Sequence, residues 1–403
     1  MLKNKLETSY SRALSPKSIC IDIVGTKDLA IAKTVVANLH RVGYSGNLYV
    51  ISEKEEFLSY KTDPSYKALG KRYDLLVISS DRLSLAELRE EIKRSKLSGI
   101  LLLETVSERY FHALQVLAEE ESVVLFGDSS IGIINLNANL NLSYLLPSLR
   151  NSSTALLSDS SAITSVLVDK AIQDNLGLGY VIDLGSNFNE SILSITEYFA
   201  ANNNVASIAI YASDPPQPVF NALNSLANEV EKSILLYDPS KDIDDFYDAL
   251  KLQTKFRKPL DSRKFSLITN LDGKLTYFSR ELNKFGFEMD AEVLAQDATA
   301  KEYAKAIESH VRKNDTSIIT VVVASQTATK MDSVSKSILQ AAQHSEKIIC
   351  PVFLGGSIAE LASVNFSNAG MVSFSDFSSL VAAIDQVNST ELIRSTKNLF
   401  RVN

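Results

Sequence analysis

The 403-residue sequence has only two cysteines, Cys20 and Cys350, and each lies in a short apolar run. Cysteine often behaves as a small buried hydrophobe, so two buried free thiols are the simplest interpretation. Nothing in this pair indicates a disulfide framework, and neither cysteine belongs to a spacing typical of a zinc site. We therefore expect a fold without disulfides and without a metal centre.

Basic clusters and long apolar runs are also missing. The formal net charge is -7, with 22% charged and 45% hydrophobic residues, whereas a nucleic-acid interface needs Lys and Arg concentrated on one face. No stretch reaches the roughly 18 apolar residues that span a bilayer. The polar start of the chain, Met1 to Pro16, lacks the apolar centre of a signal peptide. We expect a cytoplasmic protein that contacts neither nucleic acid nor membrane.

The sequence has few histidines, and none is placed for catalysis. A catalytic histidine is expected after a strand or beside a glycine loop, but all four lie within helical patterns. No Ser-His-Asp order, nucleophile elbow or metal-ligand spacing is present. We expect surface or packing roles for all of them and name no catalytic residue. The four are His40, His112, His310 and His344.

What the sequence does contain is an alternation of short apolar segments with longer amphipathic ones. Several short segments are near-continuous runs of Ile, Leu and Val, which is typical of strands buried on both faces of a parallel sheet. The expected strands are Ser18–Val24, Leu48–Ile51, Leu75–Ile78, Gly99–Leu103, Ser122–Phe126, Thr154–Leu157, Gly179–Asp183, Val205–Tyr211, Ser233–Tyr237, Phe265–Thr269, Glu288–Met289, Ser317–Val323, Lys347–Phe353 and Met371–Phe374.

Helical patterns separate these strands. In Ile31–Val42, for example, Val35, Leu39 and Val42 share one side. Strand–helix–strand repetition predicts an α/β fold of three consecutive Rossmann- or flavodoxin-like units with mainly parallel sheets. The other expected helices are Leu85–Ser95, Arg109–Glu120, Ala162–Asn175, Val219–Glu231, Ile243–Leu250, Lys301–Asn314, Met331–His344 and Phe377–Val387.

Two polar stretches interrupt the alternation and mark domain boundaries. Asn135–Ser153 is rich in Asn and Ser, and Lys251–Lys264 combines charge with Pro259. We place the three domains at residues 1–142, 143–258 and 259–403. Each has a normal domain size, since domains typically hold about 100–150 residues.

Ligands of such sheets bind beyond the carboxyl ends of the strands, where backbone N–H groups and helix N-termini meet phosphates. The first candidate loop is Gly25, Thr26 and Lys27, directly after the first strand. Gly25 permits a tight turn, and Thr26 offers a hydroxyl to an anion. A single glycine does not make a dinucleotide fingerprint, and an ordinary strand-to-helix turn explains the same residues.

Three more strand exits carry small polar residues or glycines. Hydroxyls ahead of a helix can bind an anion, but they also cap the helix, and Asp159 would repel an anion. Adjacent small residues allow close backbone approach to a ligand, but they also serve in plain turns. These candidate anion loops are Ser158, Ser160 and Ser161, then Gly185 and Ser186, then Gly355 and Gly356.

Eight short segments, in the same order along the chain, resemble motifs of the NDP-forming acyl-CoA synthetases, relatives of the succinyl-CoA synthetase α subunit. Leu14–Cys20 with Val24–Thr26 resembles the family's opening strand and CoA-binding loop. Gly127–Asn135 is similar to its Gly-Pro-Asn-Cys-Leu-Gly-Val-Ile-Asn segment. The remaining likenesses are Ala155–Ser161 to Val-Ser-Gln-Ser-Gly, Asp183–Ser186 with Glu197–Phe199 to Ser-Leu-Gly-Asn and Glu-Tyr-Leu, and Thr269–Asn270 with Phe353–Gly356 to a Thr-Asn turn and a Gly-Gly loop.

The departures from this family concern its chemistry. The resemblance places a phosphate-relaying histidine, in a Ser-His-Thr-Gly loop, after the strand Ser233–Tyr237. Here Asp238–Asp242 leads almost directly into a helix, so that loop is missing. The family's acidic residues after its Leu-Gly-Asn turn fall on Asn189, Ser191, Ile192 and Ser194, and its CoA loop is richer in glycine. A phosphoryl relay needs an imidazole that reaches two sites, so we expect no relay.

The resemblance implies that residues 1–142 bind CoA and that residues 143–258 and 259–403 form succinyl-CoA synthetase-like flavodoxin domains. We expect the first domain to bind CoA, acyl-CoA or a nucleotide through Gly25, Thr26 and Lys27, together with Ser52, Ser79 and Ser129. No segment resembles an ATP-grasp domain, so the implied partner is a separate ATP-grasp-type subunit in a homo- or hetero-oligomer. Three roles stay open: a non-catalytic or regulatory subunit, an active α-type subunit, and an interaction scaffold.

Overall fold

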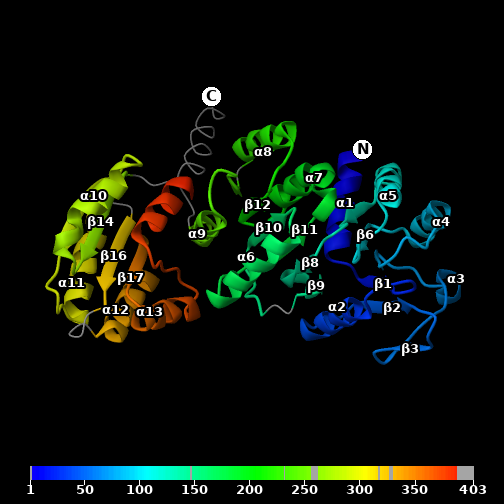
Figure 1. Cartoon of the computed structure of the whole chain (residues 1–403), viewed down its shortest axis with the longest axis horizontal. Coiled ribbons are helices and arrows are strands. Elements are labelled where there is room, and N and C mark those ends of the chain that lie inside the picture. Colours follow the sequence, from blue (N-terminus) through cyan, green and yellow to red (C-terminus); the bar gives the residue numbers. More distant parts are fainter. Residues whose placement is uncertain are drawn as a thin grey trace. The chain divides into compact units, whose positions relative to one another are not determined.

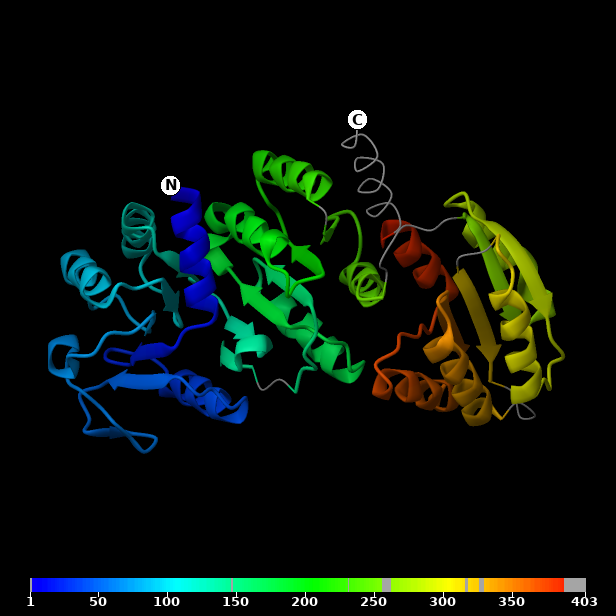
Figure 2. The same cartoon turned by 180° about the vertical axis from the view of Figure 1, so that it is seen from behind.

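The structure is a computed structural model that describes residues 2–145, 148–230, 232–255, 262–315, 318–325 and 330–387, with side chains from Leu6 onward. It divides into two compact units. One consists of Met1–Asp169 and Leu178–Leu226, and the other of Lys170–Gly177 and Ala227–Asn403. Figure 1 and the reverse view in Figure 2 show helices layered against sheets in each unit.

The first sheet has five parallel strands in the order β2-β1-β5-β6-β7. Its central strands are wholly buried, as expected for apolar runs covered on both faces. The order reverses at β1, which makes the carboxyl ends of β1 and β5 a topological switch point. The strands are β1 (Ser18–Asp22), β2 (Asn47–Ile51), β5 (Leu75–Ile78), β6 (Gly99–Leu102) and β7 (Val124–Phe126).

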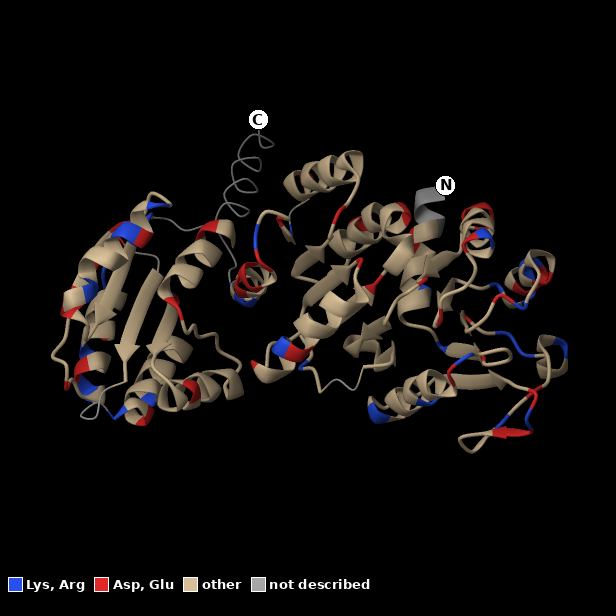
Figure 3. Cartoon of the chain, viewed as in Figure 1, with Lys and Arg blue, Asp and Glu red and all other residues tan. Residues whose placement is uncertain are grey.

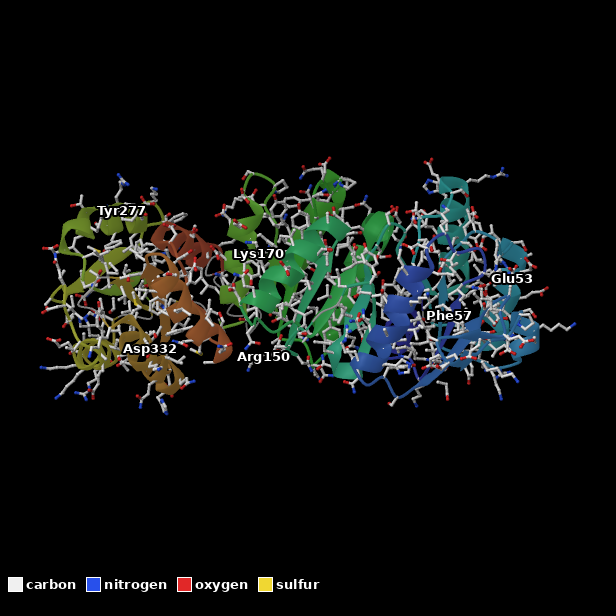
Figure 4. All side chains as sticks on the ribbon, turned by 60° about the horizontal axis from the view of Figure 1, so that its bottom comes forward. Glu53, Phe57, Arg150, Lys170, Tyr277 and Asp332 are labelled. Carbon is white, nitrogen blue, oxygen red and sulfur yellow. The ribbon has the colours of Figure 1, made fainter. Side chains whose placement is uncertain are left out.

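Helices cover both faces of this sheet. On one face α3 (Tyr66–Leu69), α4 (Leu85–Ser95) and α5 (Glu108–Glu121) share a core cluster with the strands. α1 (Leu2–Leu14) contacts β6 and β7, and α2 (Leu29–Arg41) begins at Asp28, whose side chain accepts a hydrogen bond from the Ala30 N–H. Between β2 and α3 lies a small hairpin of β3 (Glu56–Phe57) and β4 (Tyr60–Lys61), whose Phe57 is buried (Figure 4).

The second sheet has the strand order β13-β12-β10-β11-β8-β9. β10 (Thr154–Ser158) pairs in parallel with β11 (Tyr180–Asp183) and β12 (Ser207–Tyr211), whereas β8 (Gly132–Asn135) and β9 (Leu140–Ser143) form an antiparallel hairpin beside β11. The remaining elements are β13 (Ser233–Leu236), α6 (Ser161–Gln173), α7 (Phe188–Ala201), α8 (Gln217–Glu229), α9 (Ile243–Gln253) and the short 3-10 helices Leu136–Ala138 and Gly185–Asn187.

The third sheet is parallel, in the order β15-β14-β16-β17. Tyr303, Ile338 and Phe366 bring three helices onto one face. On the other face the rings of Phe278 and Phe377 lie 4.7 Å apart. The elements are β14 (Lys264–Thr269), β15 (Glu288–Val293), β16 (Ile318–Ala324), β17 (Ile348–Leu354), α10 (Leu275–Asn283), α11 (Ala300–Val311), α12 (Met331–His344), α13 (Ser357–Asn368) and a helix over residues 377–387.

These sheets confirm the expected α/β class with mainly parallel, Rossmann-like units. Some local expectations were wrong. Met371–Phe374 forms only an isolated bridge, between Val352 and Phe374, instead of a strand. The expected pattern also omitted α1, α3, α7, α10, α13 and both hairpins. The domain limits at 142 and 258 stay a prediction. The β8–β9 hairpin, which ends at Ser143, belongs to the second sheet.

Charged residues of both signs are scattered over many helices and loops of the chain, as Figure 3 shows. One example is Lys170 of α6, labelled in Figure 4, whose ammonium lies 2.9 Å from the carboxylate of Asp244. Both cysteines are buried free thiols. Within the described ranges, no helix is long and apolar enough to cross a membrane, and no group of three metal-binding side chains comes together.

Candidate functional site

The first candidate loop lies at the switch point of the first sheet, between the ends of β1 and β5. Gly25 has φ +76°, and a Cβ on it would lie 3.1 Å from Oγ of Ser80. The Ser80 hydroxyl donates a hydrogen bond to the Val24 carbonyl over 2.9 Å. The turn therefore requires glycine, both for its left-handed backbone and for its close packing on β5.

Glu104, directly after the region of β6, holds this loop. Its Oε2 accepts a hydrogen bond from the backbone N–H of Lys27 over 2.9 Å, and its Oε1 accepts one from the N–H of Asp28 over 3.2 Å. The hydroxyl of Thr26 also donates to Oε1. The Thr26 and Lys27 donors that the sequence suggested for an anion are thus bound to a carboxylate of the chain itself. The exposed Lys27 ammonium reaches the Thr105 carbonyl at 3.5 Å.

Ser52 and Ser79, expected in the same site, follow β2 and β5 and are both buried. The Ser52 hydroxyl accepts a hydrogen bond from the Lys54 N–H over 3.1 Å, so it shapes its own turn. The Ser79 hydroxyl has no hydrogen-bond partner, which is uncommon for a buried polar group. Close to the same strand ends, buried Asp22 pairs with Arg82 at 2.5 Å. This part of the site combines one unpaired hydroxyl with a paired carboxylate.

Ser129 lines a small cavity away from the first loop, together with two of the candidate anion residues. The cavity has a volume of about 230 Å³ and is lined by Ser129, Asp159, Gly185, Ser186, Phe188, Asn189 and Asp214. The Ser129 hydroxyl lies 3.2 Å from that of Thr105, and its carbonyl accepts a hydrogen bond from the Ser161 hydroxyl over 2.6 Å. Residues predicted separately from the sequence therefore meet here, within the first unit.

Gly185 cannot be replaced without moving the backbone. It has φ +50°, and a Cβ would lie 1.9 Å from the carbonyl oxygen of Asp128. The same carbonyl accepts a hydrogen bond from the Ser186 N–H over 2.9 Å. Gly185 and Ser186 therefore hold the Asp128 backbone against the second sheet. The Ser186 N–H is bonded within the chain and is not available to a ligand.

The α6 N-terminus is capped internally. The Ser160 hydroxyl accepts a hydrogen bond from the Ile163 N–H over 3.4 Å, and the Ser158 hydroxyl accepts one from the Ser160 N–H over 3.0 Å. Asp159 accepts the N–H and the hydroxyl of Ser213, each over 2.7 Å, and its second oxygen is buried without a partner. With Asp159 and Asp214 both lining it, the cavity disfavours an anion.

Asp183, at the end of β11, is the most deeply buried carboxyl of this region. It accepts hydrogen bonds from the Ile131 N–H at 2.7 Å, the Ser161 hydroxyl at 2.9 Å and the Gly185 N–H at 3.1 Å. Burial raises the pKa of Asp183 above the usual aspartate value, although these three hydrogen bonds oppose the shift. The group ties together the strand ends that form the cavity.

Gly355 and Gly356 lie in the second unit, between β17 and α13. Gly355 has φ +151°, and a Cβ would lie 2.9 Å from Cβ of Ser325, whereas a Cβ on Gly356 would meet nothing within 4 Å. At the switch point of this sheet the Asn270 side chain accepts a hydrogen bond from the Ala324 N–H over 3.0 Å. This turn needs glycine at one position and leaves open space at the other.

The curated proteins that are similar in sequence to this chain include several ADP-forming CoA ligases. A 4-hydroxybutyrate–CoA ligase [ADP-forming] of Nitrosopumilus maritimus is 25% identical over 240 residues, which cover 56% of this chain and 34% of that protein. The α subunit of acetate–CoA ligase [ADP-forming] II of Pyrococcus furiosus is 23% identical over 205 residues, 49% of this chain and 44% of that subunit. The chain is a divergent relative of the ADP-forming acyl-CoA synthetases. No family model matches it.

Solved structures extend this likeness over nearly the whole chain. The dinucleotide forming acetyl-coenzyme A synthetase 1 of Ca. Korarchaeum cryptofilum, in complex with phosphate and ADP, superposes with a TM-score of 0.85 at 16% identity and covers 96% of this chain and 98% of that one. At this identity the superposition shows a shared fold. The matched segments span only about a third to under a half of the curated relatives' own lengths.

In the present chain, a tight turn lies where the family resemblance places a relay histidine. β13 ends at Leu236 and α9 begins at Ile243. Asp238 accepts hydrogen bonds from the N–H and the hydroxyl of Ser240 over 3.0 and 2.8 Å, and the Tyr237 hydroxyl donates to the Lys241 carbonyl over 2.9 Å. The six residues 237–242 are thus occupied with closing the connection, and they contain no histidine.

The four histidines of this chain lie on helices, as expected. His40 pairs with the Tyr60 hydroxyl at 2.7 Å, and His112 and His344 are exposed on α5 and α12. His310 is buried on α11, 3.1 Å from Glu292, and burial together with Lys313 lowers its pKa. Among the described residues, no histidine lines the cavity with Ser129.

Sequence reasoning missed two carboxylates that organise the site, Glu104 and Asp183. Each directly follows or ends an apolar run at a strand exit, after Leu101–Leu103 and after Tyr180–Ile182. That position was the only available signal. The N–H groups that Glu104 binds lie 76 and 77 positions earlier in the sequence, so their pairing appears only once the strands are in register.

Proposed function

We propose that the chain is an acyl-CoA synthetase-like protein that binds CoA or acyl-CoA and works without a phosphohistidine relay, as a non-catalytic or regulatory subunit. The observation that carries this proposal is the β13–α9 connection. Its six residues are folded into a hydrogen-bonded turn, so no loop is left to carry an imidazole between two sites. The test described below also shows whether the chain binds a nucleotide instead of CoA.

The ligand part of the proposal rests on the first sheet. Its switch point carries a glycine turn, a lysine whose ammonium is exposed, and the buried, unpaired hydroxyl of Ser79 at the end of β5. Parallel sheets of this order bind phosphate-bearing ligands at this position. The similar proteins are named as CoA ligases, which supports CoA as the compound to test first.

The direct test is thermal stability of the purified protein with CoA, acetyl-CoA, longer acyl-CoAs, ATP and ADP. A ligand at about 100 times its Kd stabilises the native state by about 2.7 kcal/mol. The proposal predicts a shift with CoA esters that Lys27→Glu reduces, because this change reverses an exposed charge without altering packing. A shift with ATP or ADP alone would transfer the proposal to nucleotide binding. No shift with any of the compounds would sink it.

One observation favours an active α-type subunit as the second candidate. Two of the similar proteins are named as α subunits of acetate–CoA ligases, and an α subunit can act with a separate ATP-grasp-type chain. ADP release that depends on ATP, acid, CoA and such a chain would support this function. Absence of turnover with every candidate chain would count against it.

A protein-interaction scaffold is the third candidate, favoured by the internal bonding of the loops. Hydrogen bonds that occupy Lys27, Ser160 and Ser186 leave few donors for a ligand. A scaffold is indicated if no ligand stabilises the protein but a partner is recovered by pull-down. A cytoplasmic location, a homo- or hetero-oligomeric state and an ATP-grasp-type partner are also parts of the proposal.

A further inference from the structure

The backbone donors of the first loop are almost all used inside the chain. Five N–H groups of residues 23–28 donate hydrogen bonds, and four of these go to groups outside the adjoining carboxylate of Asp22. The Ile23 N–H donates to the Ile51 carbonyl, and the Thr26 N–H donates to the Ile23 carbonyl. The N–H groups of Lys27 and Asp28 donate to Glu104. The fifth, that of Val24, is bonded to the Asp22 carboxylate over 3.0 Å. Within this loop, which the structure describes completely, only the N–H of Gly25 is left for a ligand.

Glu104 occupies the place that an anion would take. Its two oxygens receive two consecutive N–H groups just ahead of α2 and one hydroxyl, an arrangement by which helix N-termini hold phosphate. Glu104 is buried, with 9% of its surface exposed. No ion pair joins Glu104 to a lysine or arginine of the described residues. The negative charge is therefore stabilised by the loop itself.

We propose that Glu104 is an internal anion that keeps phosphate out of this loop, so that a diphosphate-bearing ligand gains the N–H groups of Lys27 and Asp28 only by displacing the Glu104 carboxylate. The inference rests on the proposed function and deepens it, because it names the residue that sets the affinity of the site for phosphate. A protein with this arrangement binds CoA more weakly than its loop geometry alone would allow.

Two physical effects act in the same direction. The N–H groups of Lys27 and Asp28 each point at one oxygen of Glu104, so a phosphate oxygen can bind them only as a replacement. A phosphate that approaches while the carboxylate stays in place meets a like charge at hydrogen-bond distance, which disfavours the doubly charged state. Removing the carboxylate frees the two N–H groups and the Thr26 hydroxyl, and it also removes the repulsion.

The test measures binding of inorganic pyrophosphate and of CoA, by isothermal titration, to the full chain carrying Glu104→Ala or Glu104→Gln. Glu108→Gln is the matched control, since Glu108 is an exposed carboxylate at the start of α5, without a contact to the loop. The proposal predicts at least about tenfold tighter pyrophosphate binding for Glu104→Ala, because a like charge at this distance changes such equilibria by a factor of about ten or more. The Glu108→Gln variant should match the wild type.

The outcomes separate this inference from the proposed function. Tighter pyrophosphate binding by Glu104→Ala supports the inference even if neither protein binds CoA, a result that would refute the proposed function alone. The inference is overturned if Glu104→Ala binds CoA and pyrophosphate with the same affinities as the wild type. Loss of CoA binding in both Glu104 variants, with an unchanged circular dichroism spectrum, also overturns it and shows that the carboxylate positions the loop for the ligand.

Discussion

The hydroxyl of Ser161 donates a hydrogen bond to Oδ2 of Asp183 over 2.9 Å, and this contact joins the first residue of α6 to the last residue of β11. Asp183 also accepts the N–H groups of Ile131 and Gly185. One buried carboxylate therefore fixes three segments that line or adjoin the same small cavity. The fold depends on this group whether or not the cavity holds a ligand.

Removing the Asp183 carboxylate should cost more than removing one of its donors. In Asp183→Ala the buried N–H groups of Ile131 and Gly185 lose their acceptor, whereas the Ser161 hydroxyl keeps the Ser129 carbonyl. We expect the free energy of unfolding to fall by about 3 kcal/mol. In Ser161→Ala one donor is lost, the hydroxyl that is shared between Asp183 and the Ser129 carbonyl, and the expected loss is about 1 kcal/mol. Urea denaturation of the two variants measures both values. Equal losses would show that the three contacts are not shared through the carboxylate.

Stability should also depend on the charge of Asp183. Its pKa is raised by burial, so above the ordinary aspartate value of about 3.9 the native state still holds a proton that the unfolded state has lost. The contribution of Asp183 to stability is therefore largest near pH 4 and falls as the pH rises through the raised native value. Compared with Asp183→Asn, the wild type should lose stability in urea titrations over the range in which the pH rises from about 4 through the raised native pKa. A constant difference across this range would contradict the assignment.

Gly185 and Gly273 form a matched pair of glycines. An alanine Cβ at Gly185 would lie 1.9 Å from the Asp128 carbonyl oxygen at φ +50°, whereas at Gly273 it would meet nothing within 4 Å. We expect Gly185→Ala to lower the free energy of unfolding by at least about 2 kcal/mol and Gly273→Ala to change it by less than about 0.5 kcal/mol. Thermal melts of both variants check this, and a stable Gly185→Ala protein would show that the turn can relax.

The absence of a phosphohistidine relay can be tested chemically. The protein is incubated with γ-labelled ATP, alone and with a candidate ATP-grasp chain, and acid-labile label on histidine is measured. The compact β13–α9 turn predicts no such label. Labelling of His40, His112, His310 or His344 would contradict the proposed non-catalytic role, and loss of the label on replacement by glutamine would identify the residue.

The fold was predictable from the sequence where apolar runs are continuous. Ile318–Val323 and Leu75–Ile78 form buried strands as expected, because a strand covered on both faces needs no polar position. The hairpin β8–β9 was not predicted, since Ile133 and Ile134 lie in only four strand residues and their partner strand follows a 3-10 turn. Short antiparallel strands give too few positions for a period to be recognised.

The candidate site was predictable only in part. Strand exits indicated Gly25 and Gly185, because carboxyl ends of parallel strands meet at one edge, and the family resemblance indicated Ser129. What the exits could not indicate is how their donors are used. Glu104 binds the loop across 76 or more positions of sequence, and Asp183 collects partners from both sides of β11. Such pairings depend on the sheet register, which composition and spacing do not contain.

The central claim, that the first sheet binds CoA or acyl-CoA at the loop with Gly25, is tested most directly by isothermal titration of acetyl-CoA into the wild type, Gly25→Asp and Lys27→Glu. Gly25→Asp places a side chain and a charge in the turn, and Lys27→Glu reverses an exposed charge, so a folding defect in the first variant leaves the second informative. The account predicts saturable binding by the wild type that both variants weaken at least about tenfold. Wild-type protein that binds no acetyl-CoA, or variants that bind it as well as the wild type does, would contradict the claim.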